Sequence, residues 1–67
     1  NQRERIETQK KLAEVIAKWA GKMRANGMTD RQIHKYFYIH YEMTIWEALG
    51  EPKAEMLSLI ERLEGDL

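Results

Sequence analysis

The chain has no cysteine, a single proline and no long apolar run among its 67 residues. Without cysteine it can form neither a disulfide nor a thiolate metal site. No segment approaches the ~20 apolar residues that a helix needs to cross a bilayer, and no signal-peptide pattern is visible. What is present is two Trp, three Tyr, one Phe and four Met. These suffice for a small helical core but not for a deep catalytic cavity as well.

The net charge is zero, but the charges are unevenly distributed. Residues 1–40 carry nine Lys or Arg and four acids, a net of +5, whereas residues 41–67 carry two basic residues and seven acids, a net of −5. This dipole indicates either an electropositive surface for a polyanion or two halves that neutralise each other across the fold. We expect the acids Glu51, Glu55 and Glu61 to face away from any nucleic acid and to meet a basic protein surface.

Apolar residues recur at intervals of three and four, which is the period of an amphipathic helix. Two capping boxes, which begin at Thr29 and Thr44, start the second and third helices. Pro52 fits the first turn of the fourth helix. The expected helices span residues 3–25, 30–41, 45–49 and 52–64. The sequence therefore predicts an all-α fold: one domain over residues 1–67, a monomeric bundle of three main helices plus one short helix.

The core is expected to contain one large apolar side chain from each helix. These residues are Trp19, Phe37, Trp46 and Ile60. Trp46 is expected to anchor the short helix, so that Trp46→Ala should cost several kcal/mol, about 3–5. On the second helix one broad apolar face is expected, formed by Ile33, Tyr36, Phe37, Ile39 and His40. His40 is interpreted as a hydrogen-bonded core residue.

Catalytic and metal chemistry are not indicated. His34 and His40 are six residues apart, about 240° around a helix, so they point apart and do not match zinc-binding spacing. Ser58 is the only serine, and no base is placed beside it by the sequence. No Gly-rich phosphate loop is present. We therefore expect no enzyme activity, no metal and no cofactor.

A helix-turn-helix unit is suggested by the two capped segments, but its second part does not fit. A recognition helix presents Arg, Lys, Asn or Gln to base edges. The segment 44–49 offers only Thr44 and Glu47 as polar side chains, and phosphate repels Glu47. Sequence-specific DNA reading is therefore not expected.

A more suitable nucleic-acid surface is the polar face of the second helix with the end of the first. Four residues of the second helix follow the spacing i, i+3, i+4, i+7, and three cations of the first helix are expected near them. Cations beside an aromatic ring suit backbone contact with base stacking. The alternative is an ordinary solvated helix face. The candidate residues are Lys18, Lys22, Arg24, Arg31, His34, Lys35 and Tyr38.

The run His34-Lys35-Tyr36, followed by aromatic residues and Trp46, resembles the small helical C-terminal pieces that follow the motor core of some superfamily 2 DNA helicases. The resemblance covers most of the chain. It implies a non-catalytic accessory domain of a phage ATP-dependent helicase system that remodels branched DNA in recombination, repair and replication. The ATPase motifs would then lie on another domain or protein.

The implied partners are a superfamily 2 helicase and single-stranded or branched DNA, bound weakly and without sequence preference. The implied location is the cytoplasm of an infected host cell, and no membrane contact is expected. The alternative is a protein-docking domain that does not touch DNA. The chain begins at Asn1 rather than Met, from which we expect processing, trimming or a place within a longer protein.

Overall fold

The computed structural model describes all 67 residues and is all-α, as the periodicity predicts. Four helices follow one another, α1 (Gln2–Ala25), α2 (Asp30–Tyr41), α3 (Ile45–Leu49) and α4 (Lys53–Asp66). The last helix begins after Pro52, which caps it rather than joining its first turn, and continues through Gly65. None of the helices is long and apolar enough to cross a membrane.

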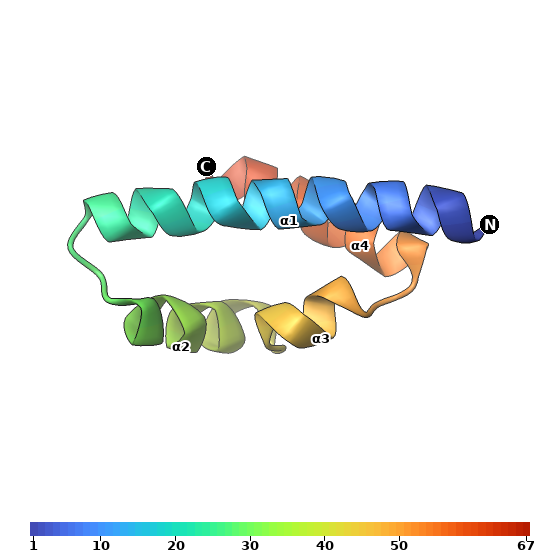
Figure 1. Cartoon of the computed structure of the whole chain (residues 1–67). Coiled ribbons are helices and arrows are strands. Elements are labelled where there is room, and N and C mark those ends of the chain that lie inside the picture. Colours follow the sequence, from blue (N-terminus) through green and yellow to red (C-terminus); the bar gives the residue numbers. More distant parts are fainter.

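The long helix α1 organises the bundle. Its largest interface is with α4, and α2 and α3 run back along it as two successive segments (Figure 1). Lys53 at the start of α4 donates a hydrogen bond to Glu4 at the start of α1. Lys22 near the end of α1 donates to the carbonyl of Leu67, which follows α4. The two helices therefore run in the same direction. Each helix contributes buried apolar residues to this shared interior.

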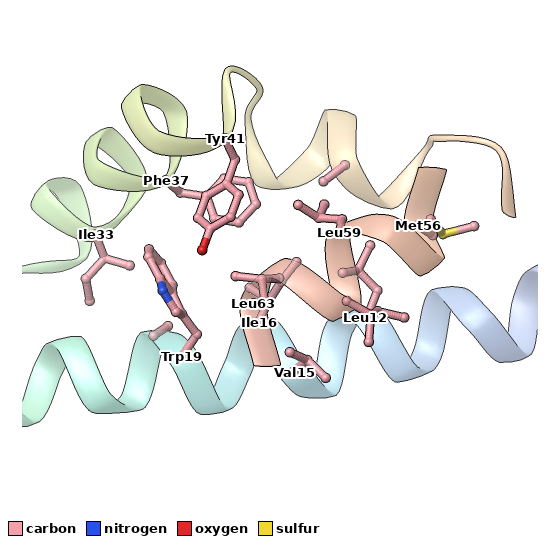
Figure 2. Packing of buried hydrophobic residues seen from close by; sticks show 13 residues of the cluster. Leu12, Val15, Ile16, Trp19, Ile33, Phe37, Tyr41, Met56, Leu59 and Leu63 are labelled. Carbon is pink, nitrogen blue, oxygen red and sulfur yellow. The ribbon is translucent and has the colours of Figure 1, made fainter. Parts of the chain in front are cut away.

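The interior is one cluster of 13 buried residues. The indole of Trp19 lies at one end of the cluster, edge-on to Phe37 at 5.6 Å and to Tyr41 at 6.1 Å between ring centroids (Figure 2). Trp19, Phe37 and Ile60 are core residues, as predicted. The cluster consists of Leu12, Val15, Ile16, Trp19, Ala20, Ile33, Phe37, Tyr41, Ala48, Met56, Leu59, Ile60 and Leu63.

The expectation that Trp46 anchors the core is wrong, because its side chain is 79% exposed. The short helix α3 reaches the core through Ala48, which is completely buried, while Ile45 and Leu49 pack at its edge. At 100° per residue Trp46 lies about 160° from Ala48, on the outer side of α3. Its replacement by alanine therefore does not open a core cavity, and the expected loss of about 3–5 kcal/mol does not apply.

The expected broad apolar face of α2 is also wrong. The buried residues are Ile33, Phe37 and Tyr41, at i, i+4 and i+8, a narrower stripe than predicted. Ile39 is 61% exposed, and Tyr36 is at the surface. His40 is likewise exposed rather than a core residue, and its ring stacks on Tyr36 with 4.0 Å between centroids.

Both capping boxes are present, which confirms the predicted starts of α2 and α3. Thr29 accepts from the Gln32 backbone N–H at 3.2 Å, and Gln32 accepts in return at 2.9 Å. The turn after α2 uses Glu42 in a left-handed conformation, at φ 61°, a region that non-glycine residues seldom occupy. This turn directs the chain into α3.

Candidate interaction surfaces

The candidate nucleic-acid residues of α2 lie together on its outer side. We call Arg31, His34, Lys35 and Tyr38 the α2 outer face; all four are exposed. Tyr38 is 55% exposed, so much of its ring is open to solvent. None of the four is acidic, and the surface presents cations beside an accessible aromatic ring.

An ion pair with the first residue of α2 holds Arg24 next to the α2 outer face. Its Nε atom donates to Oδ1 of Asp30 at 2.7 Å, which ties the end of α1 to the first residue of α2. Both side chains are largely exposed, so the ion pair contributes at most about 1 kcal/mol to stability. Its main effect is to neutralise part of the Arg24 charge.

Lys18 and Lys22 are not part of the same surface. Lys22 donates from Nζ to the Leu67 carbonyl at 2.8 Å, so it meets the end of α4. Lys18 is exposed on α1 and lies about 120° around that helix from Arg24. The structure thus divides the seven candidate residues into the α2 outer face with Arg24, and two lysines elsewhere on α1.

No group of three or more His, Cys, Asp or Glu side chains is placed to hold a metal ion. Ser58 is exposed on α4. The one strongly perturbed titratable group is Tyr41, whose pKa is raised above its ordinary value of 10.0 by burial first and by its bond to Asp66 second. That bond joins the buried Tyr41 of α2 to the exposed Asp66 at the end of α4.

A second surface, which the sequence did not suggest, is a groove between α1 on one side and α2 and α3 on the other. We call it the apolar groove. Arg24 and Asp30 are at one end of it. Its apolar lining comes from Ala13, Ile16, Ala17 and Ala20 of α1, Ile33 of α2, and Ile45 and Leu49 of α3. His34 also reaches its edge, so the groove borders the α2 outer face.

No protein-family model, curated protein or solved structure matches this chain. The helicase resemblance therefore stays a prediction from the sequence.

Proposed function

We propose that the chain is a non-catalytic accessory domain of a phage ATP-dependent DNA helicase system acting in recombination, repair and replication of branched DNA. The resemblance around His34-Lys35-Tyr36 supports the helicase setting. The contact with nucleic acid, weak and independent of sequence, is supported by one observation: the exposed cations of the α2 outer face lie beside the exposed ring of Tyr38. The partners are then a superfamily 2 helicase and single-stranded or branched DNA.

The chemistry of the α2 outer face suits the phosphate backbone better than base edges. Arg31 and Lys35 neutralise phosphates and release condensed counterions, a source of affinity that does not depend on sequence. Tyr38 offers a ring on which an unpaired base can stack. With so few charges, binding should be weak. Because it comes from counterion release, the affinity should fall as salt is raised, with a slope of roughly one unit for each phosphate contact.

Lys35→Ala should weaken binding to all DNA sequences alike and reduce the salt slope by roughly one unit, because one phosphate contact is lost. Fluorescence anisotropy with labelled single-stranded, duplex and forked DNA at several salt concentrations measures this. Lys53→Ala is the matched control: it removes the same charge, but Lys53 lies at the start of α4, bonded to Glu4 at 3.0 Å. Equal losses in both variants would show that net charge, not this face, determines the affinity.

Tyr38→Ala should weaken single-stranded DNA more than duplex, because stacking requires an unpaired base. The expected loss is about 1–3 kcal/mol for each stacked base. The same anisotropy titrations, with Tyr36→Ala as an aromatic control from the other side of α2, measure the ratio of the two affinities. An unchanged ratio in Tyr38→Ala would remove stacking from the proposal.

The second candidate is a protein-docking domain with no DNA contact, and the exposure of Trp46 favours it. An indole that is 79% exposed is a common anchor of protein interfaces, where Trp is enriched among the residues that carry most binding energy. An NMR titration decides between the two functions. If DNA at low salt shifts no amide of α2, the docking function replaces the first proposal.

A further inference from the structure

The segment between α2 and α4, residues 42–52, is held to the core by few buried side chains. Ala48 is its only buried residue, and Met43, Ile45 and Leu49 are only partly buried where they pack against the core cluster. Each of the other helices buries at least three residues. The segment also takes part in no ion pair. We call residues 42–52 the α3 flap, because α3 is its central part.

Two side-chain bonds from α1 hold the end of the α3 flap. Arg5 donates to the Gly50 carbonyl at 3.0 Å, and Gln9 donates to the Leu49 carbonyl at 2.9 Å. Bonds of this kind are exchanged for bonds to water when they break, so each contributes little net stability. The free energy that keeps the flap closed is therefore smaller than the free energy that keeps the whole domain folded.

The chain is held more firmly on both sides of the α3 flap. Before it, Tyr41 is buried and its hydroxyl donates to Asp66 of α4. After it, Lys53 pairs with Glu4 of α1 at 3.0 Å, and Met56 is completely buried. The end of α2 and the start of α4 can therefore stay in place when the flap moves.

The α3 flap has a strained residue at its first hinge. Glu42 is the one non-glycine residue with a positive φ, at 61°, a region that its β-carbon disfavours. Movement at this turn lets Glu42 return to an ordinary conformation, which offsets part of the contact energy lost. At the other end, residues 50–52 are irregular. At about 3.3 Å per residue the extended flap spans about 36 Å, so it can swing outward without pulling on α2 or α4.

The α3 flap lies over an apolar end of the core. Leu12, Met56 and Leu59 gather beneath α3 (Figure 2), and none of them is more than 4% exposed. We call these three residues the covered site. Displacing α3 from the core exposes part of their apolar surface.

We propose that the α3 flap opens locally about Glu42 and residues 50–52, while α1, α2 and α4 stay folded, and that opening uncovers the covered site. Trp46 is carried on the flap and is 79% exposed. A partner that binds this indole only in the open state would shift the equilibrium toward opening. The proposal does not depend on DNA binding, because the α2 outer face lies outside the flap.

Thiol labelling of an Ala48→Cys variant measures the opening. The chain has no cysteine of its own and residue 48 is completely buried, so a bulky thiol reagent reaches the new side chain only when α3 leaves the core. The labelling rate, divided by that of an unstructured peptide with the same cysteine, gives the open fraction. Urea unfolding of the same variant gives the globally unfolded fraction. The open fraction should be at least about thirtyfold larger, and it should change little at low urea, because opening exposes little surface.

Hydrogen exchange in the unaltered chain gives a second measurement, which does not depend on the variant. The Ala48 amide donates to the Thr44 carbonyl at 2.9 Å. A helix as short as α3 does not persist without tertiary contacts, so opening releases this amide. Its protection should be at least about thirtyfold lower than that of the Ile16 and Ile60 amides, which lie in α1 and α4.

Three further variants separate local opening from global unfolding. Gln9→Ala removes the bond to the Leu49 carbonyl, so it should speed the labelling of Ala48→Cys about 2–12-fold. Lys10→Ala is the matched control on α1 and should leave the rate unchanged, because Lys10 is exposed and forms no ion pair. Ile60→Val should raise the globally unfolded fraction about 2–12-fold and leave the labelling rate unchanged, because α4 stays packed in the open state.

Any one of three results overturns the proposal. An open fraction equal to the globally unfolded fraction would mean that α3 leaves the core only when the whole domain unfolds. Faster labelling in Ile60→Val, by the same factor as its global unfolding, would mean the same. An unchanged rate in Gln9→Ala would show that the bond to the Leu49 carbonyl does not hold the flap closed.

Discussion

Trp19→Ala should remove most of the stability of this domain. The Trp19 side chain is 1% exposed, and its ring contacts the aromatic rings of Phe37 and Tyr41. Replacing a buried Trp by Ala costs about 3–5 kcal/mol, because the side chain's transfer energy is lost and a cavity remains. A domain of this size has only a few kcal/mol of stability in total. Thermal unfolding followed by circular dichroism should show a midpoint lower by about 12–40 °C, or no folded baseline at all.

Trp46→Ala is the matched control, since it makes the same chemical change at a surface site. Surface substitutions usually alter stability by less than about 0.5 kcal/mol, so the midpoint should move by only a few degrees. The two variants together test the placement of both indoles. A large loss in Trp46→Ala would contradict the exposed position of this residue and return it to the core.

The elements of the fold could be predicted because their signals are local. A capping box such as Thr29 with Gln32 fixes a helix start through bonds among neighbouring residues. The stripe through Leu12, Ile16 and Trp19 marks the buried side of a helix long enough to show its period. These signals require no knowledge of what the helix packs against.

The orientation of α3 could not be predicted, because a helix of five residues is too short for its period to identify a buried side. Ile45, Trp46, Ala48 and Leu49 spread over about 160° around it, so more than one rotation buries an apolar side chain. The observed rotation depends on long-range bonds from α1, such as that of Gln9 to the Leu49 carbonyl. The large side chain of Trp46 favoured this residue for the core. In the structure the smaller Ala48 fills the space between α3 and the core instead.

The candidate site could be predicted in part. Exposed cations beside Tyr38 follow from residue type and helical spacing on α2, and these four residues do share one face. The position of Lys22 could not be derived in this way, because its contact with Leu67 joins residues 45 apart in the sequence. The apolar groove was missed for the same reason, since it exists only where three helices meet.

The second large expected effect is a loss of folding stability at alkaline pH, caused by the ionisation of Tyr41. Its hydroxyl donates to Oδ2 of Asp66, and the Arg62 guanidinium lies 4.8 Å from the ring centroid. Burial, followed by the bond to Asp66 and the charge of that carboxylate, raises the pKa of Tyr41 well above 10.0, while Arg62 opposes the shift. The folded chain therefore keeps this proton at pH values where the unfolded chain has lost it.

The sign of the effect follows from this difference in protons bound. Below about pH 10 the folded and the unfolded chain both hold the Tyr41 proton, and the full stability is present. Above about pH 10 the unfolded chain ionises first. Stability therefore falls as pH rises, by up to about 1.4 kcal/mol per pH unit.

Tyr41→Phe should be less stable than wild type at pH 8 by about 1.5–3 kcal/mol, because a bond to a charged group is lost. Urea unfolding between pH 8 and pH 12 should show this gap closing above pH 10, since the variant lacks the titrating hydroxyl. Tyr38→Phe, which alters an exposed ring, should keep the wild-type slope. Parallel losses in wild type and Tyr41→Phe would mean that the Tyr41 hydroxyl is not held by Asp66.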